Sequence, residues 1–141
     1  MIKVFLDSNI WLRPLVEESP ASTSVIDLFH LIEAGKIKPY TSTIVLIEVA
    51  FVLHSVYKIS HQDIKKDLFS ILETKNLTLI ELTNFPQALE LHARAGVKLT
   101  DCLITTQLPS QTTFISFDQE FKKISTINLK SPREFITQID L

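Results

Sequence analysis

The sequence predicts an α/β protein: a three-layer α/β/α domain with a mainly parallel sheet of four to five strands. Two observations lead to this fold class. Short apolar segments alternate along the chain with longer segments bounded by helix-capping residues, a pattern that favours parallel strands covered on both faces. The length of 141 residues and the hydrophobic content of 45% suit one domain over residues 1–141 with a substantial core.

The predicted strands are short runs of apolar and β-branched residues. We expect them at residues 2–6, 37–41, 77–82, 113–117 and 127–129. Pro39 weighs against the second run, because proline lacks the N–H group that a central strand uses for its ladder. The fifth run is the shortest, so the sheet has four or five strands.

Capping residues define the predicted helices. We expect helices over about residues 22–34, 43–57, 62–74, 85–95, 101–108 and 119–123, and a short one from Pro132. The residues expected at the helix starts are Ser42 or Thr43, Ser60 with Asp63, Asn84 and Thr100. Gly35 and Gly96 are expected to end the helices before them, because glycine readily adopts the left-handed conformation of a helix C-terminus.

Glu48 stands out because it lies within the apolar run from Ile44 to Leu53. A helix that is apolar on all sides is predicted to be buried. An isolated carboxylate in such a helix is strongly destabilised unless it is paired, protonated or coordinating a cation. A buried ion pair with a lysine or arginine is the structural alternative to a metal site.

Three further acids are expected near Glu48. Asp7 follows the first strand and Asp118 the fourth, and ligands of parallel sheets bind beyond the carboxyl ends of the strands. Asp101 starts a helix that could face the same edge. Four converging carboxylates repel one another, so they favour a hard cation such as Mg²⁺ or Mn²⁺. Singly, the aspartates could instead cap turns or helix starts.

Composition excludes several classes of function. Two glycines cannot build a Gly-rich phosphate loop, which makes ATP, GTP and NAD poor candidates. The balance of 14 Lys+Arg against 16 Asp+Glu, a net charge of −2, argues against a broad basic face for duplex binding. Cys102 is the single cysteine, and the apolar run 44–53 is too short to span a membrane. We therefore expect a cytoplasmic protein without a membrane partner.

Four segments in this order resemble a known family. They are Phe5-Leu6-Asp7-Ser8-Asn9, Glu48 in its apolar helix, Leu99-Thr100-Asp101-Cys102-Leu103-Ile104 and Ser116-Phe117-Asp118-Gln119-Glu120-Phe121. Together they resemble the PIN domain, and more narrowly the VapC-type toxins of bacterial and archaeal toxin–antitoxin pairs. The resemblance covers nearly the whole chain and implies the α/β fold predicted above.

By this resemblance, Asp7, Glu48 and Asp101 correspond to three core metal-binding acids, and Asp118 to a more variable fourth. The implied activity is that of an endoribonuclease that hydrolyses RNA phosphodiester bonds with Mg²⁺ or Mn²⁺. All four acids are candidate metal ligands and catalytic residues. Asp118 is also the candidate for orienting or deprotonating the attacking water.

The resemblance also assigns supporting positions. Ser8 and Asn9 occupy places where small polar residues orient the first aspartate, and Ser116 matches a hydroxyl residue two positions before the fourth acid. Arg13 and Lys122 are cations close in sequence to the first and fourth acids. They are candidate phosphate contacts, although an ordinary surface position is the more common reading for Arg13, and Lys122 carries the same ambiguity.

The family relationship further implies partners: an RNA substrate, a second copy of the chain in a homodimer, and a cognate antitoxin that covers the acidic cleft. A standalone RNA-processing nuclease is an alternative to a toxin. A catalytically silent PIN-like domain that binds RNA or protein is another. A phosphatase of the haloacid-dehalogenase type also begins with strand and aspartate, but it typically has a second aspartate where this chain has Asn9.

Overall fold

The computed structural model describes residues 1–16 and 23–139. Its strands are β1 (Ile2–Leu6), β2 (Ile37–Ser42), β3 (Thr78–Ile80), β4 (Thr112–Ile115) and β5 (Asn128–Lys130). Its α-helices are α1 (Ser8–Val16), α2 (Thr23–Glu33), α3 (Thr43–Ser55), α4 (His61–Leu72), α5 (Phe85–Ala95), α6 (Leu99–Thr105) and α7 (Pro132–Gln138). A 3₁₀ helix, η1, covers Gln119–Lys123.

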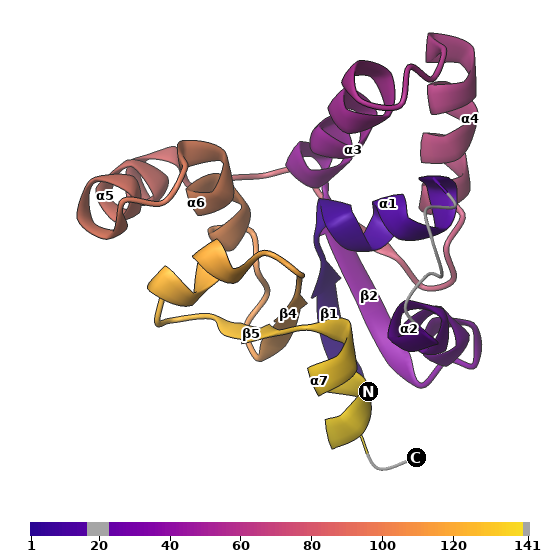
Figure 1. The fold of residues 1–141 in the computed structure, drawn as a ribbon. Helices are drawn as coiled ribbons and strands as arrows, with labels where there is room; N and C mark the ends of the chain where they lie inside the picture. The colour runs from indigo at the N-terminus through magenta and orange to yellow at the C-terminus, as the bar shows by residue number, and fades with distance from the viewer. Residues whose placement is uncertain (17–22, 140–141) are drawn as a thin grey trace.

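The strands form a five-stranded sheet in the order β3-β2-β1-β4-β5, and every adjacent pair is parallel. This confirms the predicted α/β class. Right-handed crossovers place the helices after β1 and β2 on one face and those after β3 on the other. Figure 1 shows this division, with α1 to α4 on one side and α5 and α6 on the opposite side. Strand order reverses between β1 and β4, which makes their carboxyl ends the switch point where ligands bind.

Three apolar residues of β1 fill the centre of the sheet. Val4, Phe5 and Leu6 of β1 have no exposed surface, and the ring of Phe5 lies 5.6 Å from that of Phe114 on β4. Pro39 is accommodated in β2 because it pairs with Val4 on one side, whereas the β3 register begins only at the next residue. The core therefore fixes the ends of β1 and β4 firmly against each other.

Helix α1 lies in a segment that the predicted elements leave unassigned. Trp11 is buried, and its indole N–H is 3.2 Å from the Leu6 carbonyl and 3.1 Å from the Thr41 hydroxyl. These contacts hold the helix over the sheet although Pro14 lies within it. The predicted start of the next helix at Ser22 lies outside the described residues, where α2 is seen from Thr23 onward.

The capping predictions are mostly confirmed. Ser42, Ser60 and Asn84 each accept a hydrogen bond from a backbone N–H of the first helical turn. Gly96 ends α5 with a φ of 69°, and Gly35 follows α2 with a φ of 71°. These five residues set the boundaries as the sequence predicts.

Two predictions about helices were wrong. Helix α6 begins at Leu99 with Lys98 at the N-cap position and without a side-chain cap, so Thr100 does not cap it. Helix α3 is not buried on all sides, because Ile47 is 67% and Phe51 is 69% exposed. Glu48 consequently lies at the border between the buried and the exposed faces of α3.

The two edge strands differ from the predicted runs. Strand β3 has three residues instead of the predicted six, and β5 is shifted by one position from 127–129. Both are edge strands of the described sheet, so each forms backbone hydrogen bonds with one neighbouring strand. None of the helices in the described ranges is long and apolar enough to cross a bilayer.

Candidate active site

Asp7 is held at the carboxyl end of β1 by its backbone and its side chain. Its N–H donates to the Ile115 carbonyl at 3.2 Å, which joins it to the end of β4. Its carboxylate accepts one hydrogen bond from the Ser8 N–H at 2.8 Å and one from the Ser116 hydroxyl at 2.7 Å. Asp7 is only 3% exposed. The orientation of this carboxylate is thus fixed by both strands of the switch point.

Ser116 connects the predicted supporting residues. Besides donating to Asp7, its hydroxyl oxygen accepts from Asn9 Nδ2 at 3.2 Å and from the Asp118 N–H at 2.9 Å. Asn9 Oδ1 in turn accepts from the Phe117 N–H at 3.3 Å. Ser116 has no exposed surface. Asn9 therefore reaches Asp7 through Ser116 and not directly, and the network ties the end of β1 to the segment after β4.

The four predicted acids line one pocket of about 540 Å³. Asp7 comes from the end of β1, Glu48 from α3, Asp101 from α6, and Asp118 from the segment before η1. Asp7 and Asp101 are buried, whereas Glu48 and Asp118 are partly exposed. The remaining lining consists of Ser8, Asn9, Ile47, Phe51, Val52, Lys98 and Thr100. The structure therefore gathers all four acids from distant parts of the sequence.

Burial perturbs three of these carboxyl groups. Desolvation raises the pKa of Asp7 to about 6, even though hydrogen bonds from Ser116 and Ser8 oppose the rise. Desolvation, and then repulsion by Asp7 and Asp101, raise the pKa of Glu48 to about 7, against a hydrogen bond with Ser8. Desolvation also raises the pKa of Asp101, against the pull of Lys98. Each group gains a proton more easily than an ordinary carboxyl, mainly because burial disfavours its charged form.

This donor set fits a divalent cation chemically. Within residues 1–16 and 23–139, the single ion pair closer than 4 Å joins Lys123 to Glu120, so no lysine or arginine forms a contact ion pair with the four acids. The buried-pair alternative for Glu48 is therefore wrong. In the same ranges, no group of three acidic, histidine or cysteine side chains is already gathered tightly enough to hold an ion. Mutual repulsion keeps uncompensated carboxylates apart, and a cation would draw them together.

The two predicted phosphate contacts do not line this pocket. Arg13 stacks on the Phe117 ring, with its guanidinium carbon 4.6 Å from the ring centre. Lys122 is exposed on η1 and acts electrostatically on Glu134 of α7 instead. The pocket cation is Lys98, which sequence reasoning missed. Its spacing three residues before Asp101 was the available signal, because residues three apart share one side of a helix start.

Comparison with known proteins decides the family. The PIN domain profile matches residues 4–127. The chain belongs to the PIN domain family. PIN domains are generally nucleases that use divalent metal ions. A search of curated proteins finds no match.

Several solved structures are similar to this chain over nearly its whole length. The chain is similar to VapBC2 from Rickettsia felis bound to a promoter DNA fragment, with a TM-score of 0.69, 21% identity, and coverage of 93% of this chain and 98% of that one. It is also similar to FitAcB from Neisseria gonorrhoeae, with a TM-score of 0.62, 16% identity, and coverage of 92% and 98%. A toxin–antitoxin complex from Klebsiella pneumoniae gives a TM-score of 0.61 at 17% identity, covering 92% and 97%. At these identities the likeness establishes the fold.

Proposed function

We propose that this PIN domain, as a single domain over residues 1–141, is a cytoplasmic endoribonuclease that hydrolyses RNA phosphodiester bonds with Mg²⁺ or Mn²⁺. The observation that carries the proposal is the set of four acids around one pocket without a compensating ion pair. Oxygen donors of this kind select hard divalent cations. A bound ion would supply a Lewis acid that polarises the phosphodiester and lowers the pKa of water.

The residues of the pocket have separate tasks in this proposal. Asp7, Glu48 and Asp101 would hold the ion, and the Ser8 and Ser116 hydrogen bonds fix the direction of the Asp7 carboxylate. The Asp118 carboxylate orients the attacking water or takes its proton. Its Oδ1 accepts from the Glu120 N–H at 2.9 Å, which fixes the side chain at the start of η1. Water adds to phosphorus, the bond to the leaving oxygen breaks, and that oxygen takes up a proton.

RNA cleavage with and without a chelator tests this activity. We expect the full-length protein to cleave RNA with Mn²⁺ or Mg²⁺ and to lose cleavage in EDTA. Asp101→Asn keeps the shape of the side chain but loses the charge, so it should lose cleavage and the thermal stabilisation by Mn²⁺. A wild-type protein that neither cleaves RNA nor responds to Mn²⁺ would identify a silent scaffold and refute the proposal.

We further propose that the nuclease is the toxin of a toxin–antitoxin pair and forms a homodimer. The similar structures described as VapBC2 and as a toxin–antitoxin complex support the first part. The second is supported by large apolar side chains that a single chain leaves exposed, namely Phe85 and Leu89 on α5 and Leu82 before it. Co-purification of a small partner protein from the native host, and a light-scattering mass of twice 16.1 kDa, test the two parts separately.

A further inference from the structure

Lys98 is the cation of the acidic pocket. Among the residues of 1–16 and 23–139 that line this pocket, no other lysine or arginine occurs. Its side chain is exposed, so a ligand entering from solvent can reach the ammonium group. Arg13 is engaged with Phe117, and Lys123 with Glu120. Among the described lining residues, the ammonium group of Lys98 is therefore the one cation that an anion entering the pocket can contact.

The ammonium group of Lys98 is close to the acids but not bound to them. Lys98 lines the same pocket as Glu48 and Asp101, and its charge opposes part of the rise in the pKa of both carboxyl groups. Its ammonium group nevertheless lies beyond 4 Å from every carboxylate oxygen of the described residues. The donors of this ammonium are therefore available for an external oxygen ligand.

The position of Lys98 is unfavourable for the helix that it begins. Serine, threonine, asparagine and aspartate are the preferred N-cap residues, because their side chains accept a backbone N–H. Lys98 makes no such bond at the start of α6, and a positive charge at a helix N-terminus opposes the helix dipole. Helix stability thus does not explain a lysine at this place.

The backbone around Lys98 is held firmly. Val97 is 1% exposed, and its carbonyl accepts from His92 Nδ1 at 2.6 Å and from the Cys102 thiol at 3.6 Å. The Lys98 carbonyl accepts from the Cys102 N–H at 3.0 Å. Gly96, with a φ of 69°, turns the chain sharply just before. Because the main chain is held on both sides, the flexible Lys98 side chain starts from a fixed point at the rim of the pocket that it lines.

We propose that Lys98 is the substrate-binding cation of this site, and that its ammonium group donates a hydrogen bond to a phosphodiester oxygen of single-stranded RNA beside the four acids. The proposal rests on the nuclease activity proposed above. A phosphate that approaches four carboxylates needs positive charge nearby, and Lys98 is the cation that the described residues of the chain themselves bring to this pocket. One such cation suits a single strand, because the net charge of −2 provides no broad basic face for a duplex.

Binding of a fluorescein-labelled single-stranded RNA in EDTA tests this assignment, because cleavage and metal bridging are then absent. We expect Lys98→Gln to weaken binding roughly tenfold. The slope of log Kd against log salt should fall by about 0.7, the change for one phosphate contact on a single strand. Lys98→Arg keeps the charge and should bind within about twofold of the wild type. In Mn²⁺, Lys98→Gln should raise KM for RNA more than it lowers kcat.

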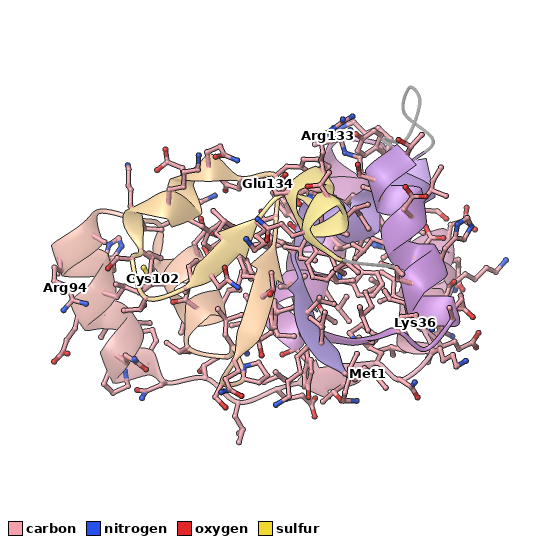
Figure 2. The ribbon with its side chains drawn as sticks, turned by 90° about the horizontal axis from the view of Figure 1, so that it is seen from below. Met1, Lys36, Arg94, Cys102, Arg133 and Glu134 are labelled. Carbon is pink, nitrogen blue, oxygen red and sulfur yellow. The ribbon has the colours of Figure 1, made fainter. Side chains whose placement is uncertain are left out.

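Lys36→Gln is the matched control. Lys36 is an exposed lysine just before β2, next to the chain start in Figure 2 and at the end of the sheet opposite the pocket. It should leave RNA affinity and salt slope unchanged. If Lys98→Gln also matches the wild type while Mn²⁺ binds more tightly, Lys98 is only a counter-charge for the acids and the inference is overturned. A wild type that neither binds nor cleaves RNA instead refutes the proposed function.

Discussion

Asp7 in the pocket and Glu134 at the start of α7 provide a matched comparison. The Asp7 carboxylate accepts from the Ser8 N–H at 2.8 Å, and the Glu134 carboxylate accepts from the Ser131 N–H at 2.9 Å. Each carboxylate also has a hydrogen bond with a serine side chain. The pKa of Asp7 nevertheless rises to about 6, whereas that of Glu134 lies below its usual value.

The difference comes from burial and from the neighbouring charges. Asp7 is 3% exposed and is repelled by Asp101 and Asp118, whereas Glu134 faces solvent near Lys122 and Lys130. Figure 2 labels Glu134 at the outer surface of the molecule. Hydrogen bonds therefore orient a carboxylate in either place, and a missing counter-charge distinguishes the acid of a site from the acid of a helix cap.

The largest expected effect is a difference in RNA cleavage between substitutions of Asp7 and of Glu134. Asp7→Asn keeps the shape of the side chain and removes its charge, so metal-dependent RNA cleavage should fall about 100-fold or more. Glu134→Gln removes a charge of the same sign outside the pocket and should leave cleavage unchanged. Initial rates in Mn²⁺, with circular dichroism of both variants as the control for folding, measure the difference. Full cleavage by Asp7→Asn would remove that residue from the proposed site.

The place of Asp7 and Asp118 could be predicted because it depends on topology alone. Both follow apolar strand segments, and the carboxyl ends of parallel strands meet at one edge. The exposure of Glu48 could not be predicted in this way. The run around it contains uniformly apolar residues, and only tertiary packing determines that Ile47 and Phe51 face solvent.

Helix α1 and Lys98 were missed for a related reason. Trp11 holds α1 in place through a hydrogen bond to the Thr41 hydroxyl, 30 positions further along the sequence. A pattern of neighbouring residues cannot predict such a contact, so it does not predict how α1 packs. Lys98 reaches the pocket because Gly96 and the buried Val97 set the direction of the chain before α6. Local patterns identify the elements, whereas contacts between distant segments decide which side chains enter the site.

Without metal, the free energy of unfolding should depend on pH through the buried acids of the pocket. Folding raises the pKa of Asp7 from 3.8 to about 6 and that of Glu48 from 4.5 to about 7. The stability linked to these protons is complete below about pH 4 and is lost as pH rises through 6 and 7. In EDTA, the free energy of unfolding should therefore fall between pH 5 and pH 8 by on the order of 2 kcal/mol, after discounting the partly exposed Glu48.

Urea denaturation in EDTA at the two pH values measures this change. Glu48→Gln removes one of the carboxyl groups whose pKa is raised, so it should reduce the fall and be as stable as the wild type, or more stable, at pH 8. The same variant should lose metal-dependent cleavage. Stability that rises between pH 5 and pH 8 in the wild type would show that the acids are compensated by groups of the protein, contrary to the proposed metal site.

The smallest expected effect concerns the helix cap. The Ser131 hydroxyl accepts from the Glu134 N–H at 3.1 Å, and the Glu134 carboxylate returns a bond to the Ser131 N–H, which makes a complete capping box. Ser131→Ala should lower the free energy of unfolding by about 1 kcal/mol. RNA cleavage below the unfolding temperature should stay unchanged, because α7 packs on α2 and β5 and contributes no residue to the pocket. Loss of cleavage in the folded variant would mean that the cap and the site are coupled, and the contrast between the two carboxylates would then fail.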